Sequence, residues 1–209
     1  MADRGVDEII IVFGVPGTGK SLIGSKLARR LGYRFTTLSW LVLQNGYWRD
    51  YDSQRRSFVI DYDALLSGIQ GIRNYRYVIE THWLEPFLEA MNPLLIVFTR
   101  THPMILFERL KRRAWPRKKV AENVEAELLG VLIEEIKTAL DKGVAVLELD
   151  TSNISVQGAV ERILDFLQNR DKNRCCIDWL SRLSENELEE VMNIIGSANA
   201  NRGDEHLEQ

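Results

Sequence analysis

The sequence predicts an α/β protein built on a doubly wound, parallel, five-stranded sheet. Five short apolar runs alternate with amphipathic segments, and a glycine-rich loop follows the first run. The runs at residues 9–13 and 94–99 are almost wholly apolar, which is typical of strands in a sheet that helices cover on both faces. A chain of 209 residues, 45% hydrophobic and 27% charged, has the size of one globular domain with a small addition.

A phosphate-binding pattern, GxxxxGK[ST], occupies residues 14–21 directly after the first predicted strand. In such a P-loop the glycines let backbone N–H groups surround a phosphate, the lysine reaches the β- and γ-phosphates, and the serine hydroxyl binds Mg²⁺. The helix that begins near the lysine adds the partial positive charge of its N-terminus. The predicted ATP·Mg²⁺ site therefore contains Gly14, Pro16, Gly17, Thr18, Gly19, Lys20 and Ser21.

The remaining elements follow from the apolar pattern. A helix over residues 20–31 ends at Gly32, and Gly24 within it indicates close contact with a neighbouring strand. Further strands are expected at residues 33–37, 75–81, 94–99 and 144–149, and further helices at 61–71, 120–141 and 156–167. Pro103 opens another helix, which Trp115 and Pro116 end. Residues 38–60 show no regular period.

The C-terminal part reads as an addition to this unit. We assign residues 1–169 to the P-loop domain and residues 170–209 to a helical appendix with an acidic tail. Ser184 and Glu187 form a capping box for a helix over residues 185–195, which Gly196 ends. Its apolar stripe predicts packing on the domain, whereas residues 197–209 have a disordered composition. The acidic tail contacts the basic segment described below, contacts a basic partner, or is merely solvated.

Composition narrows the class of protein. The sequence has neither an N-terminal apolar segment nor an 18-residue apolar run, so we expect a cytoplasmic protein without membrane contact. The net charge of −3 excludes a generally basic nucleic-acid-binding surface but leaves room for a local patch. Cys175 and Cys176 are adjacent, which suits neither a metal site nor an unstrained disulfide, so we expect both to be reduced.

Other candidate catalytic residues follow the predicted strands. Glu80 is expected to orient Mg²⁺, and His82 is expected to position an attacking hydroxyl or water unless it is a structural histidine. Ser152, in the loop after the last strand, is a further candidate for nucleotide binding.

A basic segment without acidic residues extends from Arg109 to Lys119. Arg109 and Arg113, four residues apart on a helix, are expected to reach one anion, so residues 113–119 are predicted to form a lid over the phosphates. The alternative is a solvated run of charges. Asn123 and Glu127 either hold this lid or cap its basic side chains.

These motifs resemble the adenylate kinase isoenzyme 6 family, small proteins with adenylate kinase and ATPase activity that act in small ribosomal subunit maturation. The resemblance covers about residues 9–167. It rests on the P-loop, on Asp61-Tyr62-Asp63, on Val78-Ile79-Glu80-Thr81-His82, and on Arg109-Leu110-x-x-Arg113-x-Trp115-x-x-Lys118-Lys119-Val120-x-x-Asn123-x-x-x-Glu127. It implies a nucleoside-monophosphate-kinase fold with a monophosphate-binding segment at residues 38–71, AMP as acceptor, and a ribosomal protein or ribosomal RNA as partner.

The chain departs from the family pattern at three places. Glu80 replaces an aspartate, and Ser39-Trp40-Leu41 with Leu43 replaces Gly-Asp-Leu and an arginine that grips the acceptor phosphate. Arg49, Arg55 and Arg56 are candidates for the missing charge. Residues after 169 are expected to have no counterpart in the family pattern. Three functions therefore stay open: an adenylate kinase with ATPase activity, an assembly factor that uses ATP as a switch, and a kinase of another small metabolite.

Overall fold

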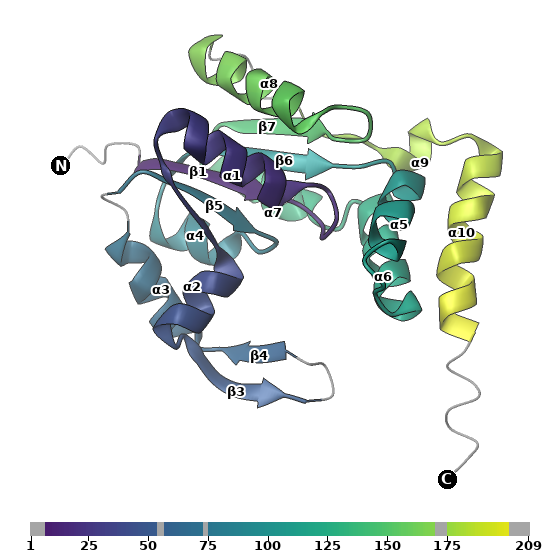
Figure 1. Cartoon of the computed structure of the whole chain (residues 1–209), viewed down its shortest axis with the longest axis horizontal. Coiled ribbons are helices and arrows are strands. Elements are labelled where there is room, and N and C mark those ends of the chain that lie inside the picture. Colours follow the sequence, from purple (N-terminus) through teal and green to yellow (C-terminus); the bar gives the residue numbers. More distant parts are fainter. Residues whose placement is uncertain (1–6, 54–56, 73–74, 170–174, 201–209) are drawn as a thin grey trace.

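The computed structural model describes residues 7–53, 57–72, 75–169 and 175–200. Its main sheet has five parallel strands in the order β2-β5-β1-β6-β7, which confirms the predicted fold class (Figure 1). The elements in chain order are β1 (Asp7–Phe13), α1 (Lys20–Leu31), β2 (Arg34–Thr37), α2 (Leu38–Asn45), β3 (Trp48–Asp52), β4 (Ser57–Ile60), α3 (Tyr62–Gly71), β5 (Tyr77–Thr81), α4 (Glu85–Ala90), β6 (Pro93–Arg100), α5 (Pro103–Lys111), α6 (Arg117–Leu128), α7 (Ile133–Asp141), β7 (Val146–Asp150), α8 (Val156–Asn169), α9 (Trp179–Arg182) and α10 (Glu185–Ala200).

Helices cover both faces of the sheet because the apolar side chains of each strand alternate between the faces. In β1, Ile9, Ile11 and Phe13 pack in one core with residues of α3, α4 and α7, whereas Ile10 and Val12 pack in a second core with residues of α1 and α8. All five side chains are completely buried. β1 therefore lies at the centre of the domain, and the loop that follows it starts from a rigid position.

A third core lies beside the sheet, where α10 packs against α5 and α6 (Figure 1). Its buried members are Leu106, Leu110, Val120, Val124, Leu128, Ile177, Trp179, Val191 and Ile195. The predicted packing of the C-terminal helix is confirmed, and so is the capping box, in which Glu187 accepts from the Ser184 backbone N–H at 2.9 Å. The helices that carry the basic segment thus pack their apolar faces against α10.

Some predicted elements are wrong in their limits. The helix expected over residues 120–141 is two helices, α6 and α7, because Gly130 adopts a left-handed backbone with φ of +62° between them. Gly196 does not end α10, which continues to Ala200. The backbone of Gly196 does not adopt the left-handed conformation that would end a helix. Helix α2, the antiparallel β3–β4 hairpin and α4 were not predicted.

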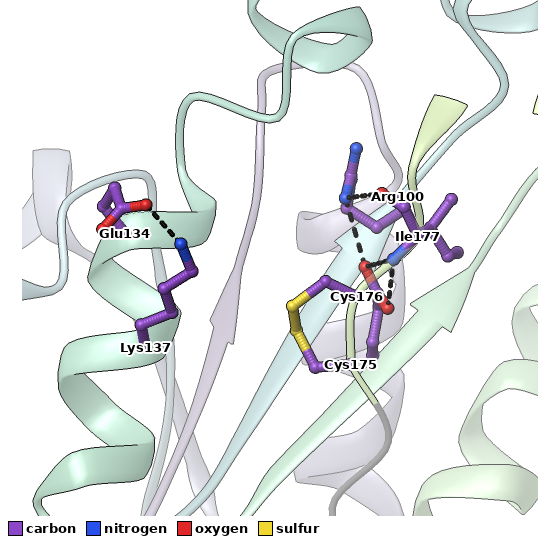
Figure 2. The surroundings of a disulfide bond; sticks show 7 residues. Arg100, Glu134, Lys137, Cys175, Cys176 and Ile177 are labelled. Atoms are coloured by element: carbon purple, nitrogen blue, oxygen red, sulfur yellow. Dashed lines mark hydrogen bonds and ion pairs between the residues drawn. A yellow bond between two sulfur atoms is a disulfide. The ribbon is translucent and has the colours of Figure 1, made fainter. Parts of the chain in front are cut away.

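The two cysteines were expected to be reduced, and this is wrong. Cys175 and Cys176 form a disulfide (Figure 2). The peptide bond between them is cis, and their Cα atoms lie 3.1 Å apart. Of the tail expected to be disordered, residues 197–200 are helical, which contradicts that expectation, and residues 201–209 lie outside the described residues. Within the described part of the chain, no helix combines the length and apolar character that crossing a membrane requires.

Candidate active site

The P-loop connects β1 to α1 at the carboxyl edge of the sheet, and its glycines have the backbone that the pattern requires. Gly14, Gly17 and Gly19 have φ of +150°, +98° and +93°, values that residues with a side chain rarely adopt. A Cβ atom at Gly14 would collide with the hydroxyl and the carbonyl of Thr99 on β6. Glycine is therefore needed here for close packing on the neighbouring strand as well as for the turn.

Lys20 lies within this loop with only 6% of its surface exposed. Its Nζ donates to the Val15 carbonyl at 3.0 Å and lies 3.9 Å from Glu80 Oε1. Burial lowers the pKa of Lys20 to about 8, the negative charge of Glu80 opposes this shift, and the positive charge of Arg113 adds to it. A phosphate bound beside the ammonium would be a second anion and would stabilise the charged form of Lys20.

Glu80 and His82 reach the P-loop from β5, which pairs with β1 so that Glu80 lies opposite Val12. His82 is the first residue after the strand, and it is exposed. Partial desolvation and the positive charge of Lys20 lower the pKa of His82, and the charge of Glu80 opposes them. A neutral imidazole at pH 7 has a free lone pair, so His82 is able to accept a proton or a hydrogen bond from an attacking hydroxyl.

The side chains at the loop fit a magnesium ion that also binds phosphate. Ser21 is exposed in the first turn of α1, and the half-buried Glu80 adds one carboxylate. Among the described residues there is no group of three or more His, Cys, Asp or Glu side chains that could hold a metal by itself. Mg²⁺ in nucleotide sites usually takes one or two protein oxygens and completes its shell with water and phosphate, so this small donor set is sufficient.

Thr18, Thr99, Thr101 and Thr151 are buried and form a connected group at the carboxyl edge, and only Thr18 is part of the predicted site. Thr18 Oγ1 lies 2.7 Å from Thr99 Oγ1, and Thr99 donates to the Phe13 carbonyl at 3.0 Å. Thr151 Oγ1 lies 2.7 Å from Thr101 Oγ1 and 2.9 Å from the Thr18 carbonyl. Thr99, Thr101 and Thr151 share one signal in the sequence, a threonine at or just after the end of a strand.

Arg109 is bound to the loop after β7. Its Nη2 donates to the Thr151 carbonyl at 2.7 Å, and its Nη1 lies 3.3 Å from the Thr101 hydroxyl. Ser152, the other candidate in that loop, accepts from the His102 N–H at 2.8 Å and donates to Asp150. Both residues join α5 to the β7 end of the sheet, so the structure gives them a supporting position at the edge where the P-loop lies.

The structure does not place Arg109 and Arg113 on one partner. Because α5 ends at Lys111, Arg113 lies in the following turn, where it is exposed and its guanidinium lies 5.9 Å from the Trp115 ring centre. Its charge nevertheless contributes to the lowered pKa of Lys20. The predicted lid, residues 113–119, thus consists of this turn and the start of α6.

The expected role of Glu127 at the basic side chains of the lid is wrong, whereas Asn123 contacts the lid. Asn123 Nδ2 donates to the carbonyl of Lys119, the last lid residue, within its own helix. Glu127 is buried and forms an ion pair of 2.8 Å with Arg100 at the end of β6. The physical reason is the direction of the helix: α6 turns Glu127 toward the sheet and away from the basic side chains. Arg100 had not been recognised as important.

The predicted monophosphate-binding segment comprises α2, the β3–β4 hairpin and α3. Leu43 and Trp40 are exposed at 47% and 58%. Arg49 forms two hydrogen bonds to Asp61, of 2.8 and 3.0 Å, and these hold the pKa of Asp61 at about 2. Arg49 is thus already paired, whereas Arg55 and Arg56 lie outside the described residues.

Comparison with known proteins agrees with this geometry. The family model described as "AAA domain" matches residues 10–130. The chain is 37% identical over 194 residues to a protein of Saccharolobus islandicus named "Putative adenylate kinase", covering 90% of this chain and 97% of that one. This match extends past residue 169, so the expectation that residues after 169 have no counterpart is wrong. A protein of the same name from Thermococcus onnurineus is 36% identical over 172 residues, with 82% and 91% covered.

Solved structures share the fold at low identity. A gluconokinase from Sinorhizobium meliloti 1021 matches with a TM-score of 0.51 and 20% identity, covering 80% of this chain and 95% of that chain. A shikimate kinase from Bacteroides thetaiotaomicron matches with a TM-score of 0.50 and 18% identity, covering 77% and 98%.

Proposed function

The chain belongs to the P-loop, nucleoside-monophosphate-kinase-like family of its relatives named putative adenylate kinase, and we propose that it transfers the γ-phosphoryl group of ATP to AMP or to water. The resemblance to the adenylate kinase isoenzyme 6 family predicts this membership. The observation that carries this proposal is the grouping of Lys20, Glu80 and His82 at the carboxyl edge of the sheet, with Lys20 Nζ 3.9 Å from Glu80. We propose that this reaction takes place in the cytoplasm.

Each residue has one task in the proposed reaction. Phosphoryl transfer depends mainly on positioning and charge stabilisation, which the P-loop backbone and the Lys20 ammonium supply at the transferred phosphoryl group. When water is the acceptor, His82 orients it and accepts a hydrogen bond from it, whereas the phosphate oxygen of AMP attacks as an anion and needs no base. ADP leaves in both cases. Ser21 and Glu80 hold Mg²⁺, which, when bound, neutralises phosphate charge. Arg113 closes over the phosphates from the lid, and Arg109 with Ser152 supports the loop beside them.

The acceptor is tested by one coupled assay. ADP formation is measured with ATP alone, with ATP and AMP, and with ATP and other small hydroxyl or phosphate acceptors. We expect AMP to raise the rate well above that of hydrolysis. Slow hydrolysis that no acceptor stimulates would contradict the kinase activity and leave the ATPase, whereas stimulation by a different metabolite would reassign the acceptor.

A second candidate function is supported by exposed apolar side chains on the segment at residues 38–71. Trp40, Leu43, Trp48, Tyr51, Phe58 and Val59 are each between 38% and 58% exposed. The rings of Trp48 and Phe58, on neighbouring strands of the hairpin, lie 5.1 Å apart. Such a surface fits a macromolecular partner better than a small acceptor. We therefore propose, as the alternative, an ATP-switched assembly factor that binds a ribosomal protein or ribosomal RNA; hydrolysis stimulated by that component and not by AMP supports it.

His82 is tested by replacement with alanine and with asparagine. For His82→Ala we expect hydrolysis to fall about 10²-fold, since the group that orients water is lost, while the Kd for ATP stays nearly unchanged. Single-turnover hydrolysis and a separate binding titration measure the two quantities. Unchanged hydrolysis in a folded variant would return His82 to a structural role, and partial recovery in His82→Asn would indicate that hydrogen bonding is the relevant property.

The pKa of Lys20 predicts how ATP affinity depends on pH. Below pH 8 the ammonium is charged and attracts phosphate, whereas above about 8 it loses its proton in the free protein and must take one up on binding. We expect the Kd to be nearly constant from pH 7 to 8 and then to rise by up to about tenfold per unit. Calorimetry in buffers with different ionisation enthalpies measures the proton uptake. A constant Kd up to pH 9.5 without proton uptake would contradict the lowered pKa.

A further inference from the structure

A buried ionic cluster joins the end of strand β6 to α6, the helix whose first turn belongs to the predicted lid. Arg100, the last residue of β6, is 0% exposed. Its Nε lies 2.8 Å from Glu127 Oε1 on α6, and its Nη1 lies 3.1 Å from Glu148 Oε1 on β7. Nη2 also donates to the Glu127 carbonyl at 3.0 Å. The guanidinium thereby fixes the C-terminal end of α6 against two strands.

The described part of the appendix, residues 175–200, completes this cluster. Arg100 Nη1 donates to the Ile177 carbonyl at 3.0 Å, and the Ile177 N–H donates to both carboxylate oxygens of Glu148 (Figure 2). The indole Nε1 of Trp179 donates to Glu127 Oε1 at 2.9 Å. The appendix is therefore attached by directional hydrogen bonds to buried charges, in addition to its apolar contacts.

A continuous path of hydrogen bonds leads from this cluster to the P-loop. The Thr101 N–H donates to Glu127 Oε1 at 2.9 Å, so Glu127 holds the backbone directly after β6. The Thr101 hydroxyl lies 2.7 Å from that of Thr151, which lies 2.9 Å from the Thr18 carbonyl in the P-loop. These threonines are at most 3% exposed, so water does not compete for their hydrogen bonds.

A single oxygen, Glu127 Oε1, is the common acceptor of three hydrogen bonds in this cluster. Glu127 Oε1 accepts from Arg100, Thr101 and Trp179, whereas Glu127 Oε2 is buried without a hydrogen-bond partner in the described structure. Trp179 supplies one of the three donors that hold this oxygen. We expect loss of the Trp179 donor to shift Oε1, and with it the Thr101 N–H bond, because no donor holds Oε2 in the described structure.

We propose that Glu127, held by Trp179 of the appendix, is a positioning residue for the nucleotide site: it fixes Thr101 and, through Thr151, the P-loop at Thr18. This inference rests on the proposed use of ATP by the P-loop. It makes the appendix part of the nucleotide-binding unit and gives a buried carboxylate outside the reacting centre a role in ATP binding.

The experiment compares two variants that destabilise the same core. Trp179→Phe keeps an aromatic ring but removes the N–H that binds Glu127, and Val191→Ala removes buried volume from the same core without touching that carboxylate. Both should lower the Tm by about 2–6 °C. We expect only Trp179→Phe to weaken ATP binding and kcat/KM, by about three- to thirtyfold. Equal effects of the two variants on ATP binding would show that the appendix only stabilises the fold, and would overturn the proposal.

A double-mutant cycle tests the path itself. Thr151→Val removes the hydroxyl beside the P-loop, and its effect on the Kd for ATP is measured alone and combined with Trp179→Phe. We expect the combined effect to be clearly smaller than the product of the single effects, because both variants interrupt one path. Independent effects would overturn the proposal. The Kd is measured without turnover, so a wild-type protein that binds ATP but does not phosphorylate AMP contradicts the proposed function and leaves this test intact.

Discussion

Replacement of Lys20 by alanine is expected to lower the turnover of ATP by at least about 10²–10³-fold while the protein remains folded. The ammonium is the one cationic group that the P-loop itself contributes, and it lies 3.9 Å from Glu80 at the edge where the transferred phosphoryl group would be held. Removal should not disturb the cores, since Lys20 belongs to none of them. Steady-state kinetics and circular dichroism measure activity and folding.

Lys26→Ala is the matched control for Lys20→Ala. Lys26 is an exposed lysine on the same helix, so its replacement removes the same charge without affecting the loop. Turnover of this control should stay within about a factor of two, because surface substitutions away from a site change little. Near-normal activity of the Lys20 variant would contradict the assignment of residues 14–21 as the nucleotide site.

Replacement of Arg100 by methionine is expected to lower the free energy of unfolding by about 3–5 kcal/mol, because it leaves Glu127 and Glu148 buried without their shared cation. Burial already raises the pKa of both carboxyls, and Arg100 opposes this. Protonated carboxyls do not need the guanidinium, so the loss should shrink as the pH falls from 8 toward 5. Chemical denaturation at several pH values measures it.

Arg76→Met is the control for this experiment. Arg76 also forms an ion pair, with Glu8, but both side chains are at least half exposed. Exposed pairs contribute little, so we expect a change of at most about 1 kcal/mol. If the Arg100 and Arg76 variants lost equal stability, the buried cluster would not fix the end of α6 in the way we describe.

The parts of the fold that the sequence predicts are those with a local signal. Strands buried on both faces must be apolar along their length, as residues 9–13 are, and a P-loop needs glycines at fixed positions. The β3–β4 hairpin was missed because its side chains are largely exposed, so no burial period marks it. The division between α6 and α7 was missed because the apolar spacing continues past Gly130, whose left-handed backbone has no counterpart in that spacing.

For the candidate site, the sequence indicates which side chains lie near the carboxyl edge of the sheet. Glu80 and His82 lie at or after the end of an easily recognised strand, and the parallel pairing of β1 with β5 brings Glu80 to within 3.9 Å of Lys20. The pairing of Arg100 with Glu127 and Trp179 joins residues from three separate parts of the chain. No spacing within one element indicates such a contact, and a single arginine at the end of a strand reads equally well as a surface charge.

The composition of the third core has a consequence for the order in which the chain folds during synthesis. The buried residues of the two sheet cores end at Val146 and Phe166, whereas the third core includes Val191 and Ile195. Because a protein is made from its N-terminus, the sheet can assemble while α10 is still inside the ribosomal exit tunnel. Helices α5 and α6 receive the apolar cover of Val191 and Ile195 only when α10 has emerged, so this side of the candidate site is completed after the sheet.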